Sequence, residues 1–251
     1  MALESTGGVQ SLRRAFDLLE KLADAGGEAG LSELAAASGL PLPTIHRLIR
    51  TLVTLGYVRQ NSNRRYALGS RLIRLGESAS RQFGTWARPF LAELVEVVEE
   101  TANLAVLDGD EVVYVAQVPS RHSMRMFTEV GRRVLPHGTG VGKAILAQLP
   151  RAEARALLAR TGLPAVTPNT ITDVGELLAA LDRIAERGYA LDEGEQELGV
   201  RCIAVPLPGA PARAAVSVSG PEGRLTEEAV HRIVPEMVAV ARRLSDRATL
   251  A

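Results

Sequence analysis

The sequence of 251 residues contains only one cysteine and four histidines, and its formal net charge is zero. The lone Cys202 excludes an intramolecular disulfide framework, and no two histidines stand at metal-ligand spacing. We therefore expect no metal site and no cofactor. The chain also lacks a signal-like first segment and any apolar run near the roughly 18 residues of a membrane span. These absences predict a cytoplasmic protein that does not bind a membrane.

The zero charge sum conceals an uneven distribution. Residues 1–82 carry 11 basic and 7 acidic side chains, a net of +4, whereas residues 83–251 carry 18 and 22, a net of −4. Between residues 34 and 76 there are seven arginines and no Asp or Glu. An arginine-rich solvated face would explain these arginines but not the missing acids, so the interval favours contact with phosphate.

The first third of the chain has the periodicity of helices. From Val9 to Leu22 apolar residues recur every three or four positions, until Gly26 and Gly27 end the helix. A second, shorter helix is predicted with Ser32 as its N-cap, and it ends at Gly39.

A third helix begins after Pro41 and has one apolar and one polar face. Its apolar positions are Ile45, Leu48, Ile49 and Leu52. Two short helices joined by a glycine turn are typical of a helix-turn-helix, whose second helix enters a DNA major groove. The candidates for groove contact are Thr44, His46, Arg47 and Arg50. For His46, a surface or packing role stays equally open.

The next segment reads as strand, polar turn and strand. Residues 57–60 and 65–68 flank the turn 61–64, which predicts a β-hairpin, the wing of a winged helix-turn-helix. Because wings lie against phosphates or the minor groove, Arg64 and Arg65 are candidates for those contacts. The expected partner is double-stranded operator DNA.

The predicted fold class has two domains. Residues 9–70 form a winged helix-turn-helix, mostly α with a β-hairpin wing, residues 71–85 form a linker helix, and residues 86–251 form an α+β domain. In the second domain we expect strands at 103–107, 111–118, 124–128, 189–192, 200–207 and 213–219, and helices at 86–101, 140–149, 151–161, 173–187 and 226–246.

Three features of the second domain could bind a ligand. The glycine-rich turn 137–143 opens an apolar helix but departs from a nucleotide-binding loop, so only the attraction of a helix N-terminus for anions remains. Ser217 and Ser219 share one face of a strand, and Cys202 lies in the strand before it. Taken alone, such residues are also typical of a solvated sheet face and of a small core residue.

The order of these motifs resembles the isocitrate-lyase-regulator (IclR) family of bacterial transcription regulators, from about residue 9 to 246. The matching segments are 9–12, 31–35, 40–48, 56–58, 138–147, 188–192, 198–204 and 215–221. The resemblance implies that the second domain is GAF-like and binds a small effector, and that the protein is a homodimer through its N-terminal region and usually a homotetramer. Members repress or activate operons for small carbon and nitrogen compounds.

The resemblance also implies an effector site between the glycine-rich turn and the sheet. Its residues here would be Met126, Gly140, Val141, Asp192, Cys202, Ser217 and Ser219. Backbone N–H groups, hydroxyls and a thiol suit a two- or three-carbon oxo-acid. This set and residues 124–131 are similar to those of the glyoxylate and allantoin-pathway repressors. We therefore predict a repressor of a small-carbon or ureide operon, controlled by a small oxo-acid or an allantoin-like effector.

Three other functions remain open from the sequence. An activator of an aromatic or other organic-acid operon would have the same two domains. A thiol hydrolase would use Cys202 with His137 or Asp192, although a nucleophile in mid-strand lacks the exposed turn usual for one. A sensor that acts through protein partners is disfavoured by the acid-free interval. The protein is predicted not to be an enzyme.

Overall fold

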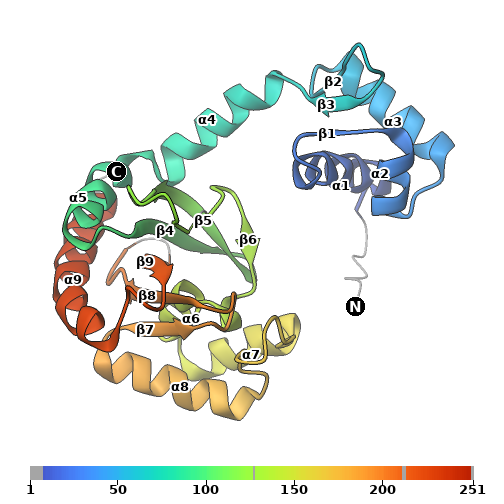
Figure 1. The fold of residues 1–251 in the computed structure, drawn as a ribbon. Coiled ribbons are helices and arrows are strands. Elements are labelled where there is room, and N and C mark those ends of the chain that lie inside the picture. Colours follow the sequence, from blue (N-terminus) through green and yellow to red (C-terminus); the bar gives the residue numbers. More distant parts are fainter. Residues whose placement is uncertain (1–7, 127, 211–212, 250–251) are drawn as a thin grey trace. The chain divides into compact units, whose positions relative to one another are not determined.

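The computed structural model describes residues 8–126, 128–210 and 213–249, which belong to two compact units, residues 1–79 and 80–251 (Figure 1). The division falls inside the predicted linker 71–85, which the structure shows as helix α4 (Arg71–Phe83). No helix in the described part of the chain is long and apolar enough to cross a membrane.

The N-terminal unit is a winged helix-turn-helix. Its elements before α4 are α1 (Gln10–Asp24), β1 (Glu28–Ala29), α2 (Leu31–Ser38), α3 (Leu42–Thr54), β2 (Val58–Gln60) and β3 (Tyr66–Leu68). Both strands of the predicted wing are present, and they pair antiparallel as β2 and β3. β1 adds to the far side of β3; two residues are too few to show strand periodicity in a sequence.

The start of the second helix corrects one prediction. Ser32 is not the N-cap, because α2 already begins at Leu31 with Gly30 in the capping position. Glu33 accepts a hydrogen bond from the Gly30 N–H group at 3.1 Å, which satisfies a backbone donor before the first turn. The predicted end is confirmed, since Gly39 has the left-handed conformation with φ 67°.

The C-terminal unit is built on one antiparallel sheet. Its elements are α5 (Arg88–Val98), β4 (Thr101–Asp108), β5 (Glu111–Val118), β6 (Arg133–Val134), α6 (Gly140–Leu146), α7 (Arg151–Thr161), α8 (Val174–Arg187), β7 (Ala190–Glu193), β8 (Val200–Pro206), β9 (Ala214–Pro221) and α9 (Glu227–Thr249). Among the described residues the strand order is β6-β5-β4-β9-β8-β7. Helices α5 and α9 cover one face, and α6, backed by α7 and α8, covers the other (Figure 1).

The predicted strand at 124–128 is wrong for the described residues, and Phe127 lies outside them. The backbone there is held by side chains instead of a ladder: Thr101 Oγ1 donates to the Met126 carbonyl at 2.9 Å, and Arg224 donates to the Met124 carbonyl at 3.0 Å. The edge of β5 pairs with β6, which was not predicted.

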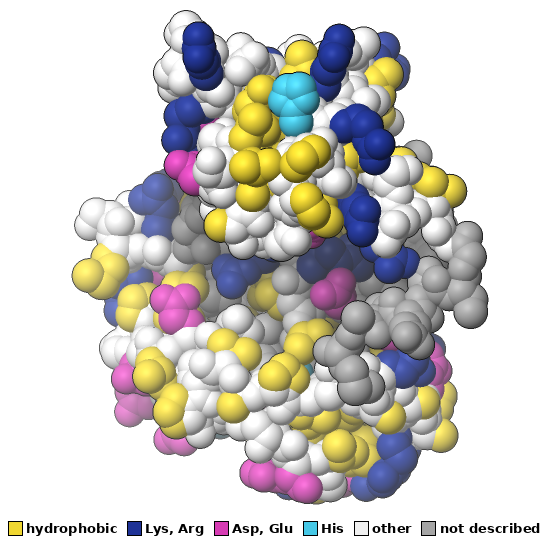
Figure 2. Space-filling view, turned by 90° about the vertical axis from the view of Figure 1, so that its right-hand side faces the viewer, with side chains coloured by type: hydrophobic (Ala, Val, Ile, Leu, Met, Phe, Trp, Pro, Cys, Tyr) yellow, Lys and Arg dark blue, Asp and Glu magenta, His cyan; other side chains and the backbone are white. Residues whose placement is uncertain are grey.

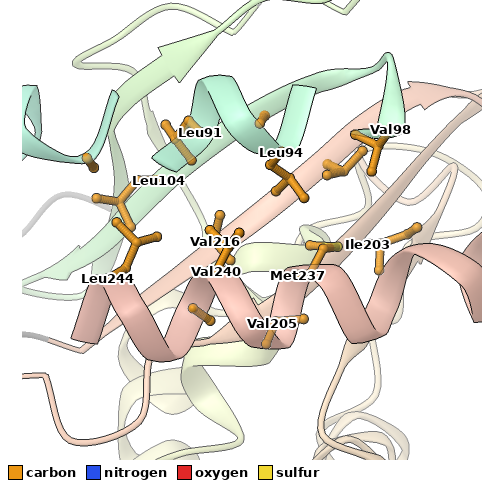
Figure 3. Packing of buried hydrophobic residues seen from close by; sticks show 14 of the residues in the cluster. Leu91, Leu94, Val98, Leu104, Ile203, Val205, Val216, Met237, Val240 and Leu244 are labelled. Atoms are coloured by element: carbon orange, nitrogen blue, oxygen red, sulfur yellow. The ribbon is translucent and has the colours of Figure 1, made fainter. Parts of the chain in front are cut away.

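The two faces of the sheet differ in size and polarity. On one face, Leu91 and Leu94 of α5 pack with Met237 and Val240 of α9 over Val216 and other branched residues (Figure 3). Beneath α6 the sheet contributes Ala105, Ala204 and Ala215, which let the short helix approach closely. The register also places Asp192 opposite Cys202, and Cys202 opposite Ser219, in one row across β7, β8 and β9.

Candidate DNA-binding surface and ligand cavity

Helix α3 exposes the side chains predicted to contact a DNA groove. Ile45 and Ile49 are buried in the core of the N-terminal unit, which leaves His46, Arg47 and Arg50 exposed and Thr44 half-buried. On the face of this unit seen in Figure 2, dark blue basic side chains outnumber magenta acidic ones. Helix α3 therefore presents a cationic surface that no neighbouring acid neutralises among the described residues.

The two wing arginines lie in different surroundings. Arg64 is exposed in the turn, where its φ is 63°. The Arg65 guanidinium donates to both carboxylate oxygens of Glu33, at 2.9 and 2.7 Å, and lies 3.0 Å from Glu28. Hydrogen bonds from Arg65 lower the pKa of Glu33. Arg65 therefore ties the wing to α2 and β1, and its charge is already compensated.

An apolar groove of about 760 Å³ runs along the N-terminal unit. Its lining residues are Val9, Ser11, Leu12, Ala15, Phe16, Leu19, Arg47, Leu48, Thr51, Leu52, Leu55, Tyr57, Leu72 and Leu75. Leu12 and Phe16 belong to the apolar pattern that predicted α1, yet they are 57% and 58% exposed. Most of that pattern thus faces the groove, whereas Leu22 lies in the core together with Leu18.

A small cavity of about 70 Å³ lies in the C-terminal unit at the polar row of the sheet. Its lining residues are Tyr114, Met126, Thr128, Arg132, Val134, Thr139, Asp192, Gln196, Glu197, Val200, Cys202 and Ser219. Four of the seven predicted effector residues, Met126, Asp192, Cys202 and Ser219, are thus brought together.

The other three predicted residues lie beside the cavity and do not line it. A Cβ atom on Gly140 would stand 3.0 Å from the Cys202 sulfur, so the first turn of α6 packs directly on β8. The Val141 side chain is buried in the core below α6. Ser217 is fully buried in the next row, where Asn103 Nδ2 lies 3.5 Å from its hydroxyl.

The acidic group of the cavity is partly stripped of water. Burial raises the pKa of Asp192 to about 6, although its carboxylate accepts hydrogen bonds from the N–H groups of Glu195 and Gln196 at 2.7 and 3.4 Å. Glu195 in turn pairs with Lys143 of α6, and both side chains are buried. This ion pair fastens the loop after β7, which carries Gln196, to α6.

The surroundings of the cavity thiol oppose its ionisation. Burial raises the pKa of Cys202 to about 12, and the nearby charge of Asp192 acts in the same direction. The sulfur is therefore protonated at neutral pH, whereas a thiol nucleophile has to be a thiolate. His137, a possible base, is buried with its Nε2 atom 3.0 Å from the Pro164 carbonyl. Among the described residues no group of His, Cys, Asp or Glu is arranged to hold a metal ion.

Comparison with known protein families identifies the family to which this two-domain chain belongs. The IclR helix-turn-helix domain matches residues 11–62, and the bacterial transcriptional regulator IclR C-terminal domain matches residues 79–246. The chain belongs to the IclR family. As an IclR-family protein it is a ligand-responsive transcriptional regulator that binds DNA, and it is not an enzyme. The two-domain fold class predicted from the sequence is confirmed, and the thiol-hydrolase alternative is wrong.

Its relatives within the IclR family include known repressors. It is 37% identical to the transcriptional repressor IclR of Escherichia coli over 96% of this chain and 90% of that protein. It is 34% identical to the HTH-type transcriptional repressor AllR of Salmonella typhi over 88% and 83%. An IclR homologue from Microbacterium hydrocarbonoxydans, crystallised with 4-hydroxybenzoate, aligns over 96% of this chain and 100% of its own with a TM-score of 0.82 at 25% identity.

Several lining residues of this IclR-family cavity were missed from the sequence. Tyr114 could have been found, because alternation along β5 places it on the same face as Val112, which packs under α6. Arg132 could not, because β6 was not predicted. Thr139 stands in the glycine-rich turn, where its hydroxyl caps α6 by accepting from the Gly142 N–H group at 3.1 Å.

Proposed function

We propose that this regulator is a repressor of a small-carbon or ureide catabolic operon, such as one for glyoxylate or allantoin. It binds double-stranded operator DNA in the cytoplasm as a homodimer or homotetramer, and a small organic-acid or ureide effector controls that binding. The observation that carries the proposal is the small cavity in which the row of Asp192, Cys202 and Ser219 meets Met126.

The size and lining of the cavity favour a very small polar effector. About 70 Å³ is far below the roughly 300–1,000 Å³ of pockets for drug-sized ligands. The hydroxyls of Thr128, Thr139 and Ser219 offer hydrogen bonds, and Met126 supplies an apolar wall. A two- or three-carbon oxo-acid fits this combination better than an aromatic ring, which argues against an activator of an aromatic-acid operon. Gly140 and Val141 lie beside the cavity, and their backbone N–H groups have no acceptor among the described residues. These free N–H groups favour an effector that carries negative charge.

For the DNA contact we propose that the first half of α3 reads bases. Thr44, His46, Arg47 and Arg50 would enter the major groove, since the start of a recognition helix reaches furthest. Arg64 would contact phosphate from the exposed turn of the wing. Arg65 supports the wing through Glu33 and would add little net charge.

The apolar groove of the N-terminal unit supports the proposed dimer. A second copy of the chain is the occupant, because α1 offers Leu12 and Phe16 along the same groove that α3 and α4 line. An isologous dimer would place two copies of α3 on a palindromic operator. Effector binding then controls transcription if the effector prefers the form of the protein that does not fit the operator.

The test combines ligand and operator titrations. Isothermal calorimetry with glyoxylate, pyruvate and allantoin is expected to show saturable binding of at least one, and 4-hydroxybenzoate serves as the aromatic-acid control. The binding ligand should release the protein from DNA upstream of its neighbouring operon in a gel-shift titration. Absence of heat with glyoxylate, pyruvate and allantoin, or binding of 4-hydroxybenzoate alone, contradicts the proposed effector class.

A further inference from the structure

The charged side chains that line the cavity differ in how many hydrogen bonds they already make. They are Arg132, Asp192 and Glu197. Asp192 already accepts two backbone hydrogen bonds, whereas Arg132 and Glu197 are exposed and therefore stand at the edge of the cavity that meets solvent. Among the described lining residues, Arg132 is the one side chain with a permanent positive charge.

The backbone of Arg132 is fixed beside the cavity. Its carbonyl accepts from the Tyr114 N–H group at 3.1 Å, and its own N–H group donates to the Glu129 carbonyl at 3.1 Å. The Gly131 N–H group donates to the Tyr114 carbonyl at 2.7 Å. Because Tyr114 also lines the cavity, the Arg132 side chain starts from a defined point next to it.

The guanidinium of the neighbouring Arg133, in contrast, is paired with carboxylates. Arg133 Nε donates to Glu111 at 2.7 Å, and Nη1 donates to Asp108 at 2.8 Å. No carboxylate in the described part of the chain lies within ion-pair distance of Arg132, and its guanidinium has no hydrogen-bond acceptor there. Two adjacent arginines thus differ in that Arg133 serves the fold and Arg132 is left free at the cavity.

We infer that Arg132 binds the carboxylate of an organic-acid effector at the edge of the cavity, and that this contact selects acids over neutral ureides. The inference rests on the proposed function and narrows its effector class. The parallel N–H groups of a guanidinium match the two oxygens of a carboxylate, and such charge-assisted bonds are among the stronger hydrogen bonds. The neutral donors Thr139, Ser219 and Cys202 then receive the carbonyl or hydroxyl end of the ligand.

Calorimetry on the full chain tests the inference with charged and neutral probes, of which pyruvate and pyruvamide have nearly the same shape. The acids are pyruvate and glyoxylate, and the neutral probes are pyruvamide and allantoin. Arg132→Gln is expected to weaken binding of the acids by about tenfold or more and to leave the neutral probes within about twofold of the parent. Arg132→Lys should restore part of the affinity for acids. Arg133→Gln is the matched control and should bind all probes like the parent.

Each outcome bears on a stated part of the inference. Parent-like binding of the acids by Arg132→Gln overturns the role of Arg132 and leaves a small-acid effector standing. An equal loss for acids and neutral probes overturns it as well, because it indicates a structural role. If the parent binds allantoin but neither acid, the inference fails and the ureide half of the proposed function survives. If it binds none of the probes, both fail.

Discussion

Gly140 of α6 lies so close to Cys202 of β8 that a Cβ atom at position 140 would stand 3.0 Å from the sulfur and 3.3 Å from the Cys202 carbonyl oxygen. The glycine-rich turn is therefore a packing device that allows the helix to rest on the polar row of the sheet. Its three glycines tolerate a methyl group to different degrees, because their neighbours differ.

The first prediction is a graded series of alanine substitutions in this turn. Gly138→Ala meets only ordinary contacts at 3.6 and 3.8 Å and should be nearly neutral. Gly140→Ala should destabilise the fold by about 1–3 kcal/mol through overpacking. Gly142→Ala would put a methyl group 2.1 Å from the Pro136 carbonyl oxygen and should prevent stable folding. Urea denaturation checks the order, and a Gly138→Ala protein less stable than Gly140→Ala would contradict it.

The second prediction separates base contact from phosphate contact. Arg47→Ala should weaken operator binding by about tenfold or more and relax base preference, because an arginine in the major groove reads bases. Arg64→Ala should weaken binding to all sequences alike and reduce its salt dependence. Gel-shift titrations against operator and scrambled DNA at several salt concentrations measure both. If both variants bind like the parent, α3 and the wing are not the contact surface.

The third prediction concerns the apolar groove of the N-terminal unit. Phe16→Glu places a charge where the second copy is proposed to pack, and it should shift the dimer toward monomer at micromolar concentration. Leu198→Glu is the control, because that leucine is 60% exposed but lies in the C-terminal unit. Sedimentation velocity reads the outcome; an unchanged dimer with Phe16→Glu would exclude the groove as the interface.

The fourth prediction is a pH dependence of stability carried by Asp192. Burial raises its pKa from 3.8 to about 6, so the folded protein holds this proton more tightly than the unfolded chain. The resulting stabilisation is complete below about pH 4 and is lost as the pH rises through 6, which amounts to about 3 kcal/mol. Asp192→Asn keeps the Oδ1 acceptor for the Glu195 N–H group and removes the titration. Its unfolding free energy should fall less than that of the parent between pH 4 and 8, and parallel curves would refute the assignment.

Much of the fold could be predicted from periodicity and turn residues. The stripe of Ile45, Ile49 and Leu52 predicted α3, and both elements that form the wing were expected from their alternation. Gly39 marked the end of α2 because only a left-handed residue closes that turn without strain. These features depend on residues close together in the chain, and such short-range patterns can be read from a single sequence.

The effector cavity could be predicted only in part, because it depends on strand register and on an edge strand of two residues. Family resemblance supplied Asp192, Cys202 and Ser219, but their alignment in one row follows from pairings between distant strands. Arg132 stayed hidden because the edge of β5 pairs with β6, and the segment around Met126 is held by side chains. The exposure of Phe16 could not be predicted either, because apolar residues at helical spacing occur both on a buried helix face and on a face that packs against another protein.

The bond from Arg65 to Glu33 limits how such a regulator can be switched. It joins the wing to α2, which packs on the recognition helix α3, so the wing and α3 are held together in one reader. A metabolite signal then has little freedom to reshape a single reader. In the proposed dimer, an effector can still change the spacing between the readers of the two subunits, and operator binding depends on that spacing because half-sites lie a whole number of DNA turns apart. Lengthening the DNA between half-sites by half a turn should therefore mimic the effector.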